Sequence, residues 1–298
     1  MYKNIRRHKL KINRILAFLL ANAVLSPLAY ALDVDAGDFE VAPAGTNLFL
    51  VYYQHAVRDE VYADSGRLPG KPRLTSDIGI LRGVHYMKLG PYTLAPQILL
   101  PFGRLDAGRD ISSLGHQNGM GDVILSAPLW FNEAGAKSQF SIAPYVFAPT
   151  GQYSKNKPLN IGENRWKFVL QAGYVQQLAD KVTLDLVADV QWHGKNNDYG
   201  SLGQTRKQRP LYNLQSFVRY KFAPGADVRI GLQRISGGEN RVDGVRQHDR
   251  QSTNRIQFGG SYFFSPTQQI TATYGRDLSV RNGFKEAHRV NLRFLQLF

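Results

Sequence analysis

Alternation between apolar and polar residues is the strongest pattern in this chain, and residues 181–194 (KVTLDLVADVQWHG) show it most clearly. A β-strand sends successive side chains to opposite faces, so residues two apart share a face. One face of this stretch is polar and carries Asp185 and Asp189, with Val187 as the one exception. The other face is wholly apolar: Val182, Leu184, Leu186, Ala188, Val190 and Trp192. The pattern predicts a strand that separates an apolar environment from a polar one.

Strand-like stretches of this kind recur to the last residue and predict an all-β fold. The connections between them alternate in length. Tight turns such as LADK and APGA are followed by long polar segments such as GKNNDYGSLGQTRKQRP. We predict twelve strands: 46–57, 77–88, 92–103, 120–131, 138–148, 166–177, 182–193, 211–222, 226–236, 253–264, 268–279 and 286–298.

The alternating connections favour a transmembrane up-and-down antiparallel β-barrel over a soluble β-sandwich. Such barrels have short periplasmic turns and long extracellular loops, and their strands face lipid on one side and a polar lumen on the other. An even number of strands places both the N- and the C-terminus on the periplasmic side. We therefore assign residues 46–298 to an outer-membrane β-barrel and residues 32–45 to a periplasmic lead-in. Aromatic residues near strand ends suit interface girdles: Trp130, Phe131, Trp166, Trp192, Tyr220, Phe222, Phe263 and Phe264.

Some strands depart from the strict alternation. The first (TNLFLVYYQH) and the fourth (GDVILSAPLW) carry apolar residues on both faces. Arg82 falls on the otherwise apolar parity of Ile78, Ile80 and Val84. An arginine on a lipid face costs up to about 2–4 kcal/mol at the bilayer midplane. We therefore expect Arg82 near the rim, or a bulge that shifts the parity.

The N-terminus has the features of an export signal. Residues 1–14 are strongly basic, residues 15–31 form a compact apolar stretch, and Ala29-Tyr30-Ala31 provides the small-x-small motif for cleavage between Ala31 and Leu32. A retained membrane anchor is the alternative, and Pro27 argues against it. Without the six basic residues of the signal, 31 Lys and Arg face 23 acids, so the net charge is +8 rather than +14. This weakens any role in nucleic-acid binding. An exported chain without cysteine points to the bacterial envelope rather than to a secreted domain built on disulfides.

The polar parity of the strands supplies candidates for a solute path through the lumen. Both charge signs occur, which leaves two interpretations. The acids and bases could pair and fill the barrel, or uneven pairing could leave a polar lane, since an unpaired buried charge is costly. The candidates for the lumen are His85, Gln97, Asp122, Gln171, Asp185, Asp189, His193, Arg219, Arg229, Arg255, Asp277 and Arg293.

Two motifs go beyond generic barrel features. GMGDVIL, residues 119–125, opens a strand after a long loop, and APTGQYSKNKPLNIGENRW, residues 148–166, follows a later strand. Together they resemble the meta-pathway phenol-degradation family of outer-membrane β-barrel proteins, which includes a sphingosine-induced branch. The resemblance implies uptake of hydrophobic or aromatic compounds and supplies no catalytic motif. From the residues themselves we expect loop shaping rather than ligand contact. The motif residues of the loop are Pro149, Thr150, Gly151, Tyr153, Asn160, Gly162, Asn164, Arg165 and Trp166.

The function that follows is passive transport of small hydrophobic or aromatic compounds across the outer membrane, released through the lumen or a lateral opening. A channel for acidic solutes along a basic lumen track and a non-conducting structural barrel are the alternatives. An enzyme is disfavoured, because His193 precedes Gly194-Lys195-Asn196 rather than a serine. We expect no metal and no other cofactor. The expected partners are membrane lipid, lipopolysaccharide, a small-molecule solute and the barrel-assembly machinery, which would read the terminal Phe298.

Overall fold

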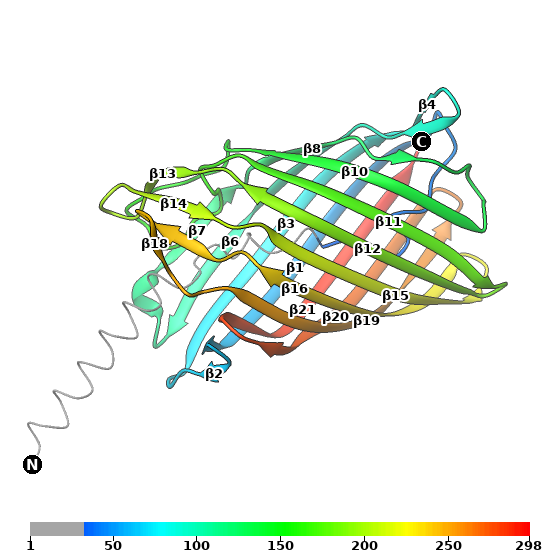
Figure 1. The fold of residues 1–298 in the computed structure, drawn as a ribbon. Coiled ribbons are helices and arrows are strands. Elements are labelled where there is room, and N and C mark those ends of the chain that lie inside the picture. Colours follow the sequence, from blue (N-terminus) through cyan, green and yellow to red (C-terminus); the bar gives the residue numbers. More distant parts are fainter. Residues whose placement is uncertain (1–32) are drawn as a thin grey trace, which may run out of the picture.

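The computed structural model describes residues 33–298, and its wall is a closed antiparallel barrel of twelve strands (Figure 1). Consecutive strands pair with each other, and the last strand pairs with the first over Leu48 to Tyr62, which closes the ring. One wall strand is interrupted and consists of β7 (His116–Met120), β8 (Val123–Ser126) and β9 (Leu129–Trp130). The others are β1 (Asn47–Ala63), β3 (Pro72–His85), β6 (Gln97–Arg109), β10 (Ser138–Ala148), β11 (Lys167–Ala179), β12 (Val182–His193), β15 (Leu211–Ala223), β16 (Ala226–Gly237), β19 (Gln251–Ser265), β20 (Gln268–Val280) and β21 (Gly283–Leu297).

Side-chain alternation explains the regular part of this wall. In β12, Asp185 and Asp189 are buried in the bore, while Leu186 and Trp192 are exposed on the outside. The paired strand β15 keeps the same parity, since Asp189 stands opposite the buried Asn213. An outward apolar surface of this kind is the surface that a bilayer accepts.

The two rims of the barrel differ, as the loop lengths predict. Short turns lie at one rim together with Phe298, and the hairpin of β4 (Met87–Leu89) and β5 (Tyr92–Leu94) extends from it. At the other rim, β2 (Gly66–Arg67) extends β1, and the 3₁₀ turn η1 (Ser112–Leu114) follows β6. A separate antiparallel sheet also rises there: β13 (Asn196–Tyr199), β14 (Gln204–Gln208), β17 (Asn240–Val242) and β18 (Val245–Arg246). We call these the short-turn rim and the long-loop rim.

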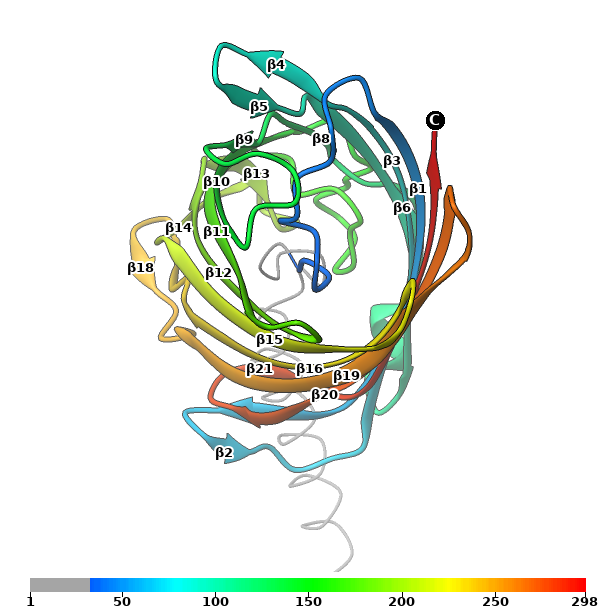
Figure 2. The same ribbon diagram turned by 90° about the vertical axis from the view of Figure 1, so that its right-hand side faces the viewer.

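The segment 33–46 contains the described part of the predicted periplasmic lead-in, residues 32–45; it runs through the barrel and leaves it at the short-turn rim, where residues 43–45 are exposed. Figure 2 shows it in blue within the ring of strands. Val34, Ala36 and Phe39 belong to an apolar cluster with Ala143 and Val169 of the wall. The bore of the described structure is therefore occupied by the residues that precede the first strand. No helix among residues 33–298 is long and apolar enough to span a bilayer.

Three expectations about side-chain direction are corrected by the structure. Arg82 faces the bore rather than lipid, and no bulge places it there: β3 pairs with β1 and β6 without a register shift, and its apolar parity points inward. His85 therefore falls on the outward parity, where it is exposed and its Nδ1 lies 2.8 Å from Asn47 Oδ1. Trp130 is 2% exposed and points inward rather than into a girdle. Trp166 and Trp192, by contrast, are exposed on the outer wall.

Candidate functional site

The segment 33–46 is held in the bore by backbone hydrogen bonds to inward side chains. Gln139 accepts a hydrogen bond from Val41 N at 2.7 Å, and Trp130 Nε1 donates to Phe39 O at 2.9 Å. Arg229 donates to Ala36 O at 2.8 Å. Buried backbone groups need such partners, so these side chains replace the ladder that a strand would have supplied.

Ion pairs tie the same segment to the opposite part of the wall. Arg293 contacts Asp38 at 2.5 Å and Asp35 at 3.3 Å, and Asp33 pairs with Arg289. Glu40 pairs with Arg219 at 2.7 Å. Asp33, Asp35, Asp38 and Glu40 of the segment therefore neutralise Arg219, Arg289 and Arg293 of the lumen.

A second ionic network lies in the bore nearer the long-loop rim and shares Arg289 with the first. Glu286, which is fully buried, pairs with Arg58, with Arg255 at 2.9 Å and with Arg289 at 2.7 Å. Asp277 accepts from Arg255 Nε at 2.9 Å and also from the Glu286 backbone N at 2.7 Å. Buried charges are tolerated when they are paired and hydrogen-bonded, which is the case here.

The structure brings the predicted lumen residues, apart from His85, into the bore. They are buried against one another and against the segment 33–46: Gln97, Asp122, Gln171, Asp185, Asp189, His193, Arg219, Arg229, Arg255, Asp277 and Arg293. Each arginine of the suggested basic track has a carboxylate partner within 4.0 Å. Arg219 pairs with Asp185, Arg229 with Asp227 and Arg255 with Asp277, while Arg293 uses Asp35 and Asp38. Because all four arginines are paired with carboxylates, they do not form a row of free cations along which an acidic solute could pass.

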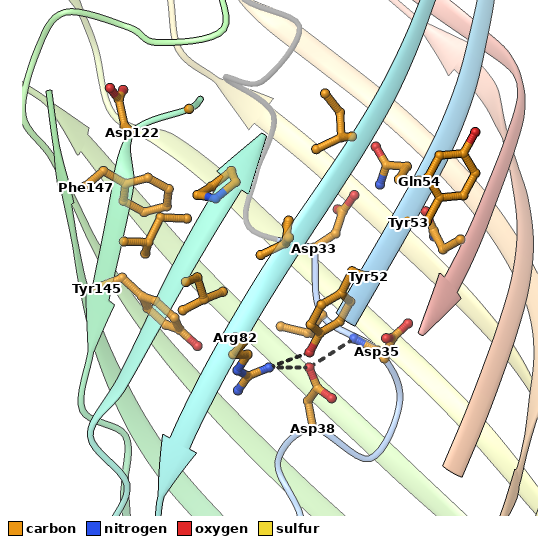
Figure 3. A pocket seen from close by; sticks show the side chains of 18 of the residues that line it. Asp33, Asp35, Asp38, Tyr52, Tyr53, Gln54, Arg82, Asp122, Tyr145 and Phe147 are labelled. Atoms are coloured by element: carbon orange, nitrogen blue, oxygen red, sulfur yellow. Dashed lines mark hydrogen bonds and ion pairs between the residues drawn. The ribbon is translucent and has the colours of Figure 1, made fainter. Parts of the chain in front are cut away.

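An apolar cavity of about 200 Å³ lies in the other part of the bore. It lies beside the contact that the segment 33–39 makes with strands β3, β6, β8 and β10, and Figure 3 shows Phe147 and Tyr145 on one side of it and Tyr52 on the other. Its charged lining consists of the acids Asp33, Asp35, Asp38, Asp122 and Glu163 and the cations Arg82, Lys167 and Arg289. Its aliphatic lining includes Ile78, Ile80, Leu99, Ile124 and Ile161. These aliphatic residues were not among the predicted lumen residues, which were chosen for polarity; for Ile78 and Ile80 the apolar parity of β3 was assigned to lipid.

Arg82 and Asp38 separate this cavity from a second, more polar cavity of about 360 Å³ toward the short-turn rim. Both residues line both cavities, and they contact each other at 3.4 Å. Arg82 also donates to Tyr52 Oη at 2.9 Å and to Gln97 Oε1 at 2.7 Å (Figure 3). An axial path from one cavity to the other must therefore pass this hydrogen-bonded group.

The motif loop folds over the apolar cavity through a close contact between two glycines. A Cβ atom on Gly151 would lie 2.8 Å from Gly162 Cα, and one on Gly162 would lie 2.6 Å from Gly151 C. Asp122 fastens the two ends of the loop, accepting from Gly151 N and from Glu163 N, each at 2.9 Å. The GxGD motif (residues 119–122) and the PTG motif (residues 149–151) are therefore held together by hydrogen bonds. Thr150 Oγ1 adds another by accepting from Val123 N at 3.0 Å.

The remaining motif residues shape the loop in different ways. Asn160 donates to the backbone carbonyls of Ser154 and Lys157. Asn164 and Arg165 donate to side chains, Asn196 at 3.1 Å and Gln208 at 2.6 Å, while Tyr153 donates to Asp198 O at 2.9 Å. Pro149 is partly buried where the loop begins, and Trp166 is exposed on the outer wall at its end.

Glu163 is the one acidic residue of the motif loop, residues 149–166. Burial alone would raise its pKa, but the cations of Lys167 and Arg165 hold the pKa of Glu163 well below its ordinary value. Lys167 lies 3.1 Å and Arg165 2.5 Å from its carboxylate. The carboxylate at the edge of the cavity is therefore ionised and neutralised by two cations.

The signal cleavage site and the recognition of Phe298 by the assembly machinery stay predictions. The cleavage site Ala31–Leu32 lies outside the described residues, and Phe298 is 73% exposed at the short-turn rim. Among residues 33–298, no group of three or more His, Cys, Asp or Glu side chains is placed to hold a metal ion.

A closed barrel with an apolar outer belt and a polar, partly occupied bore defines an outer-membrane protein of the channel class. The family described as "Putative MetA-pathway of phenol degradation" matches residues 58–294. The chain belongs to this family, and the resemblance carried by the GxGD and PTG motifs is confirmed.

Solved structures agree with this assignment. The COG4313 outer membrane channel from Pseudomonas putida F1 is 43% identical, with a TM-score of 0.87 over 89% of this chain and 100% of that chain. The β domain of the Bordetella autotransporter BrkA is 10% identical, with a TM-score of 0.51 over 86% of this chain and 100% of that chain, and shows the fold alone. The search of curated proteins found no match.

Proposed function

We propose that this barrel takes up small hydrophobic or aromatic compounds, which bind in the apolar cavity on their way across the outer membrane. The observation that carries the proposal is the cavity itself. Ile80, Leu99 and Ile124 face the bore, where the lumen of a polar channel would carry hydrophilic side chains. Apolar surface in a lumen gains from binding an apolar ligand, because the ligand displaces water from it.

Binding is tested directly with a fluorescent naphthylamine probe and the purified barrel in detergent. Ile80→Trp fills the cavity, and we expect it to weaken probe binding at least about tenfold, the effect of losing about 1.4 kcal/mol. Leu214→Trp is the matched control, because Leu214 is 57% exposed on the outer wall and lines no part of this cavity. Equal binding by wild type and Ile80→Trp would reject the cavity as the site.

A lateral exit through the wall is the route that the contacts favour. The ladder between β6 and the interrupted strand skips a register, from Phe102↔Met120 to Leu99↔Ile124, and one backbone hydrogen bond, from Gly121 N to Pro101 O at 2.8 Å, joins the strands in this gap. Pro101 has no N–H to donate, and Gly121 and Pro101 line the cavity. The axial route is filled by the segment 33–46 and by the group around Arg82.

Cross-strand disulfides distinguish the two routes, and the chain offers a clean background because it has no cysteine. Phe102→Cys with Met120→Cys would lock the wall beside the gap, since these residues are Cα partners. We expect the oxidised pair to slow uptake of a hydrophobic substrate in cells, and reduction to restore it. Val218→Cys with Ile230→Cys, Cα partners across β15 and β16, is the matched control and should leave uptake unchanged. Unchanged uptake with the first pair oxidised would favour the axial route.

A further inference from the structure

We propose that the outer face of the four-stranded sheet at the long-loop rim binds the phosphate groups of lipopolysaccharide. Three cations stand side by side on that face, one on each of three adjacent strands. Lys207 of β14 is the Cα partner of Arg241 of β17, which is in turn the Cα partner of Arg246 of β18. We call Lys207, Arg241 and Arg246 the cation row. At about 4.8 Å between strands, the row spans about 10 Å.

The alternation of the sheet shows that the row faces outward. The neighbouring residues Arg206, Gln208, Asn240 and Val242 are buried on the inner face. Gln208 accepts from Arg165 of the motif loop, and Arg206 Nε donates to Asn240. Lys207 and Arg246 are exposed on the other side (Figure 1 shows this sheet extending beyond the wall).

Nothing in the described part of the chain neutralises the row. None of its three side chains has an ion pair within 4.0 Å or a hydrogen bond among residues 33–298, and Arg241 Nε is buried without a partner. Like charges directly opposite each other destabilise a sheet. The cations of the bore, by contrast, are paired with carboxylates. An external anion would supply what the row lacks.

The position of the row favours a membrane anion as the occupant. The apolar outer wall beneath it ends in Trp192 and Tyr212, exposed by 41% and 52%, as aromatic residues do at an interface. Lys207 lies only five residues from Tyr212, at most about 17 Å along an extended chain. Arg234 is the first outward residue beyond Leu232 on β16, and it is exposed between the belt and the row. Cations therefore continue from the edge of the apolar belt outward.

Lipid A is the anion that fits this position. The long-loop rim is the one expected at the cell surface, and the outer leaflet there presents phosphorylated sugar headgroups. Arginine and lysine recognise phosphate by charge and hydrogen bonds, and each cation near an anionic surface strengthens binding about fivefold. Three cations therefore strengthen the binding of lipid A up to about a hundredfold.

The test measures binding of diphosphoryl lipid A to the full barrel in neutral detergent by native mass spectrometry. The triple variant Lys207→Gln, Arg241→Gln, Arg246→Gln should lose at least tenfold in affinity. The control variant Lys88→Gln, Lys137→Gln, Lys181→Gln removes the same charge from exposed positions at the short-turn rim and should lose less than twofold. An equal loss in both variants, or no loss in the first, would overturn the proposal.

Two further binding measurements distinguish lipid A from other anions. Millimolar inorganic phosphate should compete only weakly, because it lacks the acyl chains that rest on the apolar belt. Phosphatidylglycerol should bind the wild type at least tenfold more weakly than lipid A. If phosphatidylglycerol binds as tightly, the site is a general anionic contact and the assignment to lipid A is wrong. Arg246→Gln alone, on the terminal strand of the sheet, should show an intermediate loss and guards against misfolding of the triple variant.

Discussion

Strands β12, β15, β16, β19 and β21 turn charged side chains into the bore, whereas β3, β6 and β8 turn mostly aliphatic ones into it. In the first group Asp185, Arg219 and Arg229 meet partners of opposite charge. In the second, Ile78, Leu99 and Ile124 line a cavity. We call the two groups the charged sector and the apolar sector. Both form one wall with the same hydrogen-bonded ladder, so the ladder does not decide what the bore contains.

The difference teaches what kind of cavity each sector lines. The acids of the segment 33–46 pair with arginines of the charged sector, and the cavity of about 360 Å³ beside these pairs is lined by Arg219, Arg229 and Arg293. The segment also packs Val34, Ala36 and Phe39 against Leu99 and Ile124 of the apolar sector, and the cavity of about 200 Å³ beside this contact has the aliphatic lining.

The largest effect is expected from Glu286→Leu in the charged sector. Glu286 is fully buried among Arg58, Arg255 and Arg289, so its loss leaves buried cations without their shared carboxylate. We expect the free energy of unfolding to fall by about 3–5 kcal/mol, measured by urea unfolding in lipid vesicles. Asp106→Asn is the control, because Asp106 pairs with Arg104 at an exposed site and should cost less than about 1 kcal/mol. Similar losses in the two variants would mean that burial does not set the strength of these pairs.

Much of the charged sector was predictable from the sequence, and much of the apolar sector was not. The parity of Asp185, Asp189 and Arg219 places them in the bore without any knowledge of their partners. The same argument fails for Ile80, because alternation shows that β3 has one apolar parity but does not show that this parity meets the bore rather than lipid. Arg82 was the one signal available: its presence on the apolar parity of β3 is explained once that parity faces the bore.

The path of the segment 33–46 through the bore could not be predicted from the sequence either. Its acids, Asp33, Asp35, Asp38 and Glu40, are spaced irregularly and match no motif. Their role depends on arginines about 180 to 255 residues away, such as Arg219 and Arg293. Only the closed ring brings these groups together, so no local pattern could have predicted the contact.

Over the apolar sector, Gly162→Ala is expected to have the next largest effect. The new Cβ would meet the backbone of Gly151 at 2.6 Å, and no side-chain rotation can relieve that contact. Overpacking of this kind costs about 1–3 kcal/mol, and displacement of Ile161 should also weaken probe binding in the cavity. Gly83→Ala is the control, since its Cβ would meet only Ile98 at 3.9 Å. If Gly162→Ala binds the probe as tightly as wild type and is as stable, the loop does not form the wall of the site.

A pH effect is expected where the loop meets the cavity, at Glu163. The pKa of Glu163 is held below its unfolded value, so its ionised form stabilises the fold above that value. This contribution is complete above about pH 4.3, the ordinary pKa of a glutamate, and is lost as the pH falls through the lower folded pKa. Unfolding midpoints measured from pH 7 down to acid should therefore decline more steeply in wild type than in Glu163→Gln. Parallel declines would show that Glu163 is not stabilised by Lys167 and Arg165.

The smallest effect is expected from Glu40→Gln, which removes an ion pair of the segment 33–46 without burying a free charge. Glu40 lies 2.7 Å from Arg219, but its side chain is 48% exposed, and Arg219 keeps Asp185 at 2.7 Å. Solvent screens such a pair, so the free energy of unfolding should change by about 0–1 kcal/mol. Single-channel conductance should likewise stay close to that of wild type, because Arg293 still holds the segment through Asp35 and Asp38. A loss as large as that of Glu286→Leu would mean that the segment, rather than the buried network of the wall, stabilises the charged sector.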